Sequence, residues 1–422
     1  MGLFVVFLLL SRKKRDFSIY GIKSERGDPC LVCRKFYTRI LCIIMLISLT
    51  GCWDYRPLES LSFTVGIGVD QEETGEFIMT MQFINTQGSS GGKQSHLTEH
   101  PIYQGKGKTI QDAFSQATLH VPHYVFMANT QVVIIGENVA KQGLKQTLDY
   151  LYRFQNLRPD FSIVIARHQK AKDLLQVTPH LSNGSSEKIS SIARKMEQGK
   201  TFSIGTHLTF LNLLTNISTP DKGYVLNSFK VFGNTKIGKT IRNTESIQPP
   251  AQLSPTGLAV FQNDILQGWL TIPESVGYNY ILGTAHLVPE TLSCSRNKKV
   301  LGQVVTSTSK RSVKRIGSRL HARVKVQAKV YLTGIACKKE LSPENITSLE
   351  IGFKKQIEHH MRQTMHQAQH KFKLDIFDFS NAFAHSYPKE WLYVQKKWNA
   401  YFTKMKVTYD VHVKIEHIIK NI

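Results

Sequence analysis

The chain has 422 residues, and its 54 Lys and Arg against 31 Asp and Glu give a formal net charge of +23. This length predicts two or three domains of roughly 100–200 residues each, and a hydrophobic content of 41% excludes a disordered protein. The mean hydropathy of −0.21 excludes a polytopic membrane protein, and six cysteines are too few for a disulfide scaffold.

The segment 34–52 has the three parts of a bacterial export signal. Basic residues precede the ten-residue apolar run Ile40–Leu49, and Thr50-Gly51-Cys52 follows it. The ending has the form of a lipobox, in which small residues admit the peptidase and only a thiolate is nucleophilic enough to take a diacylglycerol. Ten apolar residues cannot span about 30 Å of hydrocarbon, which disfavours an uncleaved anchor. We therefore predict lipid attachment at Cys52.

A second short apolar stretch, Leu3–Leu10, lies upstream and is followed by basic residues. Export signals do not carry such a leader, which favours a start near Leu31 or Val32 and leaves open whether 1–33 are translated. The pair Cys30 and Cys33 then lies outside the working protein, and no second pair completes a zinc site. Nine Lys and Arg and three Asp and Glu fall in 1–51, so the rest of the chain keeps a net charge of +17.

Strand and helix patterns alternate along the next part of the chain, which is typical of an α/β layer domain. The expected strands are 61–69, 77–83, 132–135 and 161–165, and the expected helices are 110–117, 144–152 and one that begins at 171. A Ser-, Asn- and Gly-containing stretch, 181–186, then interrupts the pattern and indicates a boundary.

The second half of the chain is less regular at first and clearer at its end. We expect a helix at 208–214, strands at 226–232, 257–261, 267–270, 320–331 and 407–415, and a helix opening at Pro388. Ser342-Pro343 forms a good helix start, and an apolar stripe then runs from Ile346 to Phe372. This pattern predicts a long helix packed on a sheet.

The expected fold class is a multi-domain α/β (mixed α+β) protein, with mixed sheets packed by helices. We expect a leader over 1–51, a lipid-anchored start over 52–56, and α/β domains over 57–190, 200–300 and 301–422.

Catalytic and cofactor motifs are incomplete. Gly105-Lys-Gly-Lys-Thr109 resembles the end of a phosphate-binding loop, but Ile102 stands where its first glycine belongs. Gly66-Ile-Gly68 begins a dinucleotide fingerprint, but Gln71 replaces the third glycine and the motif lies inside a strand. Both are interpreted as ordinary backbone geometry, and we predict no catalytic residue and no cofactor.

Metal and disulfide chemistry is also weakly supported. His359, His366 and His370 share one helical face opposite the apolar stripe, without a carboxylate third ligand, so we expect a solvated face and no metal. The carboxylates Asp375 and Asp378 flank Phe377 with no partner visible in the sequence. Beyond Cys52, the mature cysteines Cys294 and Cys337 could pair in an exported protein, and the sequence leaves this open.

The excess of Lys and Arg over Asp and Glu has three interpretations. It could bind nucleic acid, although no nucleic-acid module is present and an exported lipoprotein rarely meets DNA. It could face anionic lipid headgroups, or it could be a generally solvated surface. A predicted lipid anchor favours the lipid-facing and the solvated surface, because a lipid anchor and a basic surface together bind a membrane more stably than either does alone.

Cys52-Trp53-Asp54-Tyr55-Arg56, followed by the strand ending Gly66-Ile-Gly68-Val-Asp70, resembles the Ger(x)C family. The similarity continues through several later stretches, in the same order along the chain. They are Gly107–Ile110, Val132–Glu137, Ala171–Leu175, Asp375–Phe377, Tyr387–Lys389, Trp391 and Trp398. Pro57 stands where the family usually has Glu, and 276–296 match only loosely.

This resemblance implies a non-catalytic C subunit of a nutrient germinant receptor, built of three α/β domains. The protein would be a lipoprotein on the outer face of the spore inner membrane. It would act with a multi-pass A subunit and a membrane-embedded B subunit. A solute-binding lipoprotein that holds the nutrient itself is the alternative, and a hydrolase acting on peptidoglycan has only stray carboxylates in its favour.

Overall fold

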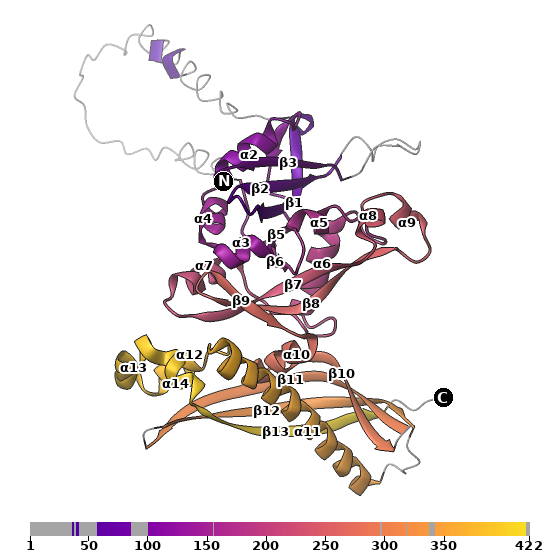
Figure 1. Ribbon diagram of the computed structural model, residues 1–422, viewed down its shortest axis with the longest axis vertical. Coiled ribbons are helices and arrows are strands. Elements are labelled where there is room, and N and C mark those ends of the chain that lie inside the picture. The colour runs from indigo at the N-terminus through magenta and orange to yellow at the C-terminus, as the bar shows by residue number, and fades with distance from the viewer. Residues whose placement is uncertain are drawn as a thin grey trace, which may run out of the picture. The chain divides into compact units, whose positions relative to one another are not determined.

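The computed structural model describes residues 36–37, 39–41, 57–85, 100–154, 156–295, 298–317, 319–336 and 342–418. The chain divides into two compact units, Met1–Pro57 and Leu58–Ile422. In the first unit, the described residues at 36–41 are helical and exposed. In the second unit, the buried core of the described chain begins at Thr64 and is shared between two sheets (Figure 1).

The larger sheet has nine strands, in the order β3-β2-β1-β5-β6-β7-β8-β9, with β4 paired to β1. The strands are β1 (Leu61–Gln71), β2 (Phe77–Phe83), β3 (Ile102–Gly107), β4 (Tyr124–Phe126), β5 (Val132–Gly136), β6 (Ser162–Ala166), β7 (Gly223–Gly233), β8 (Ala251–Gln262) and β9 (Ile265–Leu270). The central strands β1, β5, β6 and β7 are parallel, and antiparallel strands extend the sheet on both sides. Every residue of β5 and β6 is buried, as expected for strands covered on both faces.

Helices cover the two faces of this sheet. They are α2 (Ile110–Thr118), α3 (Glu137–Gln142), α4 (Lys145–Arg153), α5 (Ala171–Leu175), α6 (Ser185–Glu197) and α7 (Phe210–Ser218). Two short helices, α8 (Thr235–Gly238) and α9 (Arg242–Glu245), lie in the connection from β7 to β8. Successive residues of a strand point to opposite faces. Val133 and Ile135 of β5 therefore join one core with α2, α3, α4 and α7, whereas Val132 and Ile134 join the other with α5 and α6.

The smaller sheet has the order β10-β11-β12-β13, and its last strand is parallel to β12. Its strands are β10 (His286–Ser295), β11 (Lys298–Ile316), β12 (Arg319–Ile335) and β13 (Lys406–Ile418). The helix α10 (Ile272–Leu282) leads into it from β9. The helices α11 (Pro343–His366), η2 (Gln367–Phe372), α12 (Phe379–Ser386), α13 (Pro388–Val394), η3 (Gln395–Lys397) and α14 (Trp398–Thr403) connect β12 to β13.

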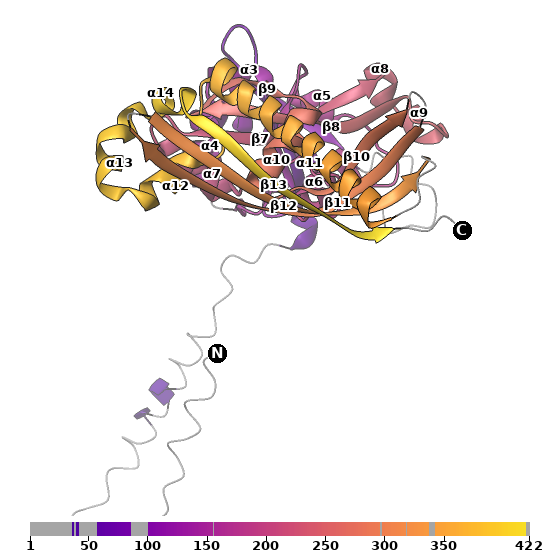
Figure 2. The ribbon, with the colours of Figure 1, turned by 90° about the horizontal axis from the view of Figure 1, so that it is seen from below.

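The long helix α11 runs along the smaller sheet (Figures 1 and 2). Ser342 caps it by accepting a hydrogen bond from Asn345 N at 3.3 Å, and Pro343 occupies the first turn. Phe353, Ile357 and Met361 are fully buried against the sheet. The helix continues through the wider turn of η2 to Phe372, so the predicted long helix packed on a sheet is confirmed.

The expected fold class is confirmed, because the described chain consists of two mixed sheets packed with helices. Within the range expected for a middle domain, 200–300, β7–β9 pair in the larger sheet and β10 pairs in the smaller one. The three domain boundaries stay a prediction. Among the described residues, no helix is both long and apolar enough to cross a membrane.

Candidate functional site

A polar cavity of about 560 Å³, the edge pocket, lies where β1, β5 and β6 end. Its walls include Asp70, Glu137 and His168. From β1 the chain continues to β2 and β3 on one side, whereas β5, β6 and β7 extend the sheet on the other side. Open α/β sheets bind ligands at the carboxyl ends of strands where the strand order reverses. This position makes the edge pocket the first candidate site.

The carboxylate of Asp70 occupies the start of α5. It accepts hydrogen bonds from Ala171 N at 2.7 Å and Lys172 N at 3.1 Å, and Asp70 is only 3% exposed. A Cβ on Gly136 would overlap Asp70 Oδ1, so the glycine makes this approach possible. Burial raises the pKa of the Asp70 carboxyl, and the two backbone donors offset part of that rise. The carboxylate therefore takes the place that an external anion would need.

Glu137 is engaged in a similar way. Its carboxylate accepts a hydrogen bond from His168 N at 2.6 Å, contacts His168 Nδ1 at 3.0 Å and pairs with Lys141 Nζ at 2.7 Å. Burial pushes the pKa of Glu137 upward, but Lys141 and His168 outweigh it and leave the pKa below its usual value. The main acidic groups of the edge pocket thus bind the protein's own donors and fasten the ends of β1, β5 and β6 together.

We expect Glu137→Gln to weaken the fold at neutral pH and to have less effect in acid. A carboxylate whose pKa is lowered by folding stabilises the protein above its unfolded pKa, which is about 4.5 for Glu137. This contribution disappears as the pH falls through the lowered folded value. Thermal unfolding of both proteins between about pH 7 and pH 3 measures this. The difference in Tm should shrink with falling pH, and a constant difference would contradict the assignment.

The glycine motif in β1 serves helix packing. Gly66 and Gly68 lie inside the strand, as the sequence indicates. A Cβ on Gly66 would overlap Ser186 Oγ of α6, and a Cβ on Gly68 would lie 3.0 Å from Leu175. These glycines let α5 and α6 approach the sheet, so the motif has a structural explanation without a dinucleotide.

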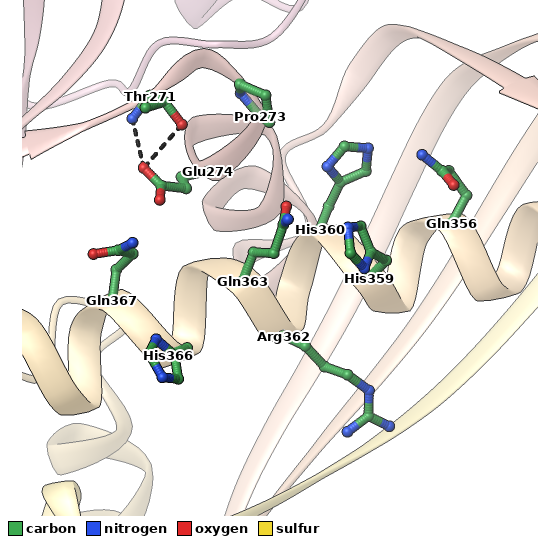
Figure 3. Close-up of a pocket in the computed structure, with 10 residues that line it drawn as sticks. All are labelled: Thr271, Pro273, Glu274, Gln356, His359, His360, Arg362, Gln363, His366 and Gln367. Atoms are coloured by element: carbon green, nitrogen blue, oxygen red, sulfur yellow. Dashed lines mark hydrogen bonds between the residues drawn. The ribbon is translucent and has the colours of Figure 1, made fainter.

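A second cavity, the helix groove, has a volume of about 730 Å³ and lies between the start of α10 and the second half of α11 (Figure 3). Glu274 accepts hydrogen bonds from Thr271 N at 2.7 Å and Thr271 Oγ1 at 2.9 Å, which caps α10. Thr364 Oγ1 of α11 donates to Glu274 O at 2.7 Å and ties the two helices together. The side chains of His359, His360 and His366 reach the groove from α11.

A buried carboxylate lies behind the groove. Glu290 of β10 is 3% exposed and accepts a hydrogen bond from Tyr280 OH at 2.9 Å. His360 Nε2 lies 3.5 Å from the other oxygen of Glu290, and His360 Nδ1 is buried without a hydrogen-bond partner. This arrangement connects α10, β10 and α11 through polar groups, which the sequence pattern does not reveal.

The structure places the remaining predicted residues as follows. His359, His366 and His370 are exposed on α11 and η2, and the described residues contain no group of three or more His, Cys, Asp or Glu that could hold a metal ion. Cys52 lies outside the described residues, as does Cys337. Lipid attachment at Cys52 therefore stays a prediction, and a disulfide between Cys337 and Cys294, whose backbone belongs to β10, stays an open alternative.

Asp375 and Asp378 do have partners. Asp375 is buried and accepts four hydrogen bonds, three from backbone N–H groups of Phe377, Phe379 and Ser380 and one from Trp398 Nε1. Asp378 forms an ion pair with Lys222 of the segment before β7. Asp375 therefore fastens helices around the smaller sheet, whereas Asp378 ties the start of α12 to the segment that precedes β7 of the larger sheet.

Comparison with known proteins shows relatives along nearly the whole described body. The family described as "Spore germination protein N-terminal domain" matches residues 54–231, and the family described as "Spore germination B3/ GerAC like, C-terminal" matches residues 256–419. Spore germination protein KC of Bacillus subtilis (strain 168) is 26% identical over 376 residues, which cover 87% of this chain and 91% of that protein. Spore germination protein B3 of the same organism is 24% identical, with coverage of 88% and 95%.

The fold also has a counterpart among solved structures. The crystal structure of the GerBC protein matches with a TM-score of 0.50 and 18% identity, and the match covers 86% of this chain and 99% of that chain. At this level of identity the likeness shows the fold alone.

Proposed function

The chain belongs to the Ger(x)C family of spore germination proteins, and from this premise we propose that it is a subunit of a spore nutrient-germinant receptor. The two family matches, over residues 54–231 and 256–419, carry this proposal. The matched relatives B3 and KC are named as spore germination proteins and align along most of their own length.

We propose that the protein is held on the outer face of the spore inner membrane by a lipid on Cys52, where it acts with integral-membrane A and B subunits. The lipobox ending in Thr50-Gly51-Cys52 supports the anchor. The chain from Cys52 to Leu58 can reach about 20 Å at most, so the lipid would keep the folded unit close to the bilayer.

The proposed role is assembly or signalling without catalysis. Asp70 and Glu137, the most buried acidic groups of the edge pocket, bind backbone and side-chain donors of the protein itself. Their geometry supports a role in fixing the fold, because neither is left to act on a bound substrate.

Gene deletion and a Cys52→Ala variant test this proposal. Spores without the protein should form in normal numbers but fail to germinate with a subset of nutrients, and the wild-type gene should restore the response. The Cys52→Ala protein should move from the detergent phase to the aqueous phase, because one lipid anchor is lost. Unchanged nutrient responses in a strain without a second homologue would overturn the receptor role.

A solute-binding lipoprotein is the second candidate, and the helix groove favours it because its volume falls in the range of small-molecule pockets. A directly bound nutrient should raise the thermal stability of the purified protein by RT ln(1 + [L]/Kd), about 2.7 kcal/mol at a hundredfold excess over Kd. A panel of nutrients with no shift would leave nutrient recognition to the membrane subunits.

A further inference from the structure

The smaller sheet has one covered face and one open face. Val324, Val326 and Val330 of β12 are fully buried on the side of α11. The alternate side chains point the other way, and those of Arg323 and Lys329 are 65% and 54% exposed. Nothing in the described part of the unit covers this second side, so the open face meets solvent.

The open face is strongly basic. Register places the outward positions of β11, β12 and β13 side by side, and six of them are lysines. They are Lys310, Lys314, Lys325, Lys329, Lys406 and Lys414. Arg319 and Arg323 add two more cations, and we call these eight residues the basic face. The acidic residues at outward positions of the three strands, within the described residues, are Asp410 and Glu416, which pair with Arg323 at 2.6 Å and Lys329 at 2.9 Å.

Folding alone does not explain this arrangement. Lys310 lies directly opposite Lys325 across β11 and β12, and Lys329 lies directly opposite Lys414 across β12 and β13. Like charges at opposed positions destabilise a sheet. Asp410 of β13 also lies opposite Lys325, and Glu416 pairs with Lys329, so two acidic groups offset part of this repulsion. Eight cations against two acidic side chains therefore leave a net repulsion across this face, which points to a use for the charge outside the protein.

The chemistry of the basic face fits an anionic lipid surface better than it fits a nucleic acid. Lysine is a strongly hydrated point charge that attracts anions without fixed geometry, whereas arginine binds phosphates bidentately. Single-stranded nucleic acids are bound through several aromatic side chains on which the bases stack. Among the described outward positions of β12, Tyr331 is the only Phe, Tyr or Trp, so the basic face lacks this feature. A broad array of lysines on a sheet instead matches the spread-out negative charge of lipid headgroups.

We propose that the basic face docks on the anionic headgroups of a lipid bilayer. This inference rests on the proposed function, because a chain tethered at Cys52 meets the bilayer at a high effective concentration. The lipid then limits the distance between the protein and the membrane, and the basic face determines which side of the protein lies against the headgroups.

A fragment that comprises only Leu58–Ile422 allows this inference to be tested without the lipid anchor. This unit is compact and contains the described buried core. Sedimentation with vesicles of phosphatidylcholine, and with vesicles containing about one third phosphatidylglycerol, measures partitioning. We expect binding to the anionic vesicles alone, weakening as salt is added. Replacing Lys310, Lys325, Lys406 and Lys414 with Gln should lower the partition coefficient by roughly six hundredfold, because each of the four cations near an anionic surface contributes about fivefold.

A matched control removes the same charge elsewhere. Lys145, Arg153, Lys195 and Lys236 are exposed residues of the part built on the larger sheet, and their replacement with Gln should change partitioning only slightly. Equal losses in both variants would show that net charge rather than the basic face drives binding, and would overturn the proposal. Tighter binding of a short DNA duplex, lost in the same four-lysine variant, would overturn it in favour of nucleic acid. Since the fragment lacks Cys52, these results are independent of lipidation and of the germination phenotype.

Discussion

The Asp375→Ala protein should unfold with a free energy about 3–5 kcal/mol below that of the wild type. Asp375 is 4% exposed, and its carboxylate accepts hydrogen bonds from Ser380 N at 2.7 Å and Trp398 Nε1 at 2.8 Å. It also accepts bonds from Phe377 N at 3.1 Å and Phe379 N at 3.2 Å. Truncation leaves these four donors buried without an acceptor, so the start of α12 and its attachment to α14 are both lost.

Asp378→Asn is the matched control, because this neighbouring carboxylate is 39% exposed and pairs with Lys222. Asn tolerates the left-handed backbone of Asp378, where φ is 64°, so the variant removes mainly the ion pair. A partly exposed ion pair contributes up to about 1 kcal/mol. Denaturation by guanidinium, followed by tryptophan fluorescence, should separate the two variants, and similar losses for both would contradict the network assigned to Asp375.

Local periodicity made much of the fold predictable. The apolar stripe from Ile346 to Phe372 and the alternation in 320–331 are long, regular patterns, and they became α11 with η2 and part of β12. The helix α6 was missed because its buried face includes Ser185, Ser186 and Ser190, which resemble loop residues in a sequence. Burial of Ser185 and Ser186 is possible because Gln82 of β2 accepts hydrogen bonds from Ser185 Oγ and Ser186 N, a contact across about a hundred residues.

The candidate site was harder to predict, because its partners are distant in the chain. Asp70 was visible as the end of a strand, but its donors, Ala171 and Lys172, follow about a hundred residues later. The net charge indicated a basic protein but did not show where the positive charge gathers. The basic face forms only when β13 pairs with β12, and about seventy residues separate these two strands in the sequence. The lipobox is the opposite case, because its signal is entirely local and lies in residues outside the described chain.

The strongest packing test concerns Phe353 of α11, which is fully buried against the smaller sheet. Phe353→Ala should lower the free energy of unfolding by about 3–5 kcal/mol, because it loses buried apolar surface and leaves a cavity. Ile351 is 49% exposed on the same helix, and Ile351→Ala should change stability by less than about 0.5 kcal/mol. Urea denaturation of the unit Leu58–Ile422 gives both values.

Gly302 of β11 shows whether the ring of Phe353 causes this loss. A Cβ on Gly302 would lie 2.5 Å from Phe353 Cζ, so Gly302→Ala should cost about 1–3 kcal/mol through overpacking. In the Phe353→Ala background the added methyl group points into the cavity and should cost little or stabilise the fold. The double-mutant cycle should therefore give a coupling energy of about 1–3 kcal/mol. Additive effects would mean that the sheet relaxes away from α11, and that contact with Phe353 is not what keeps position 302 free of a side chain.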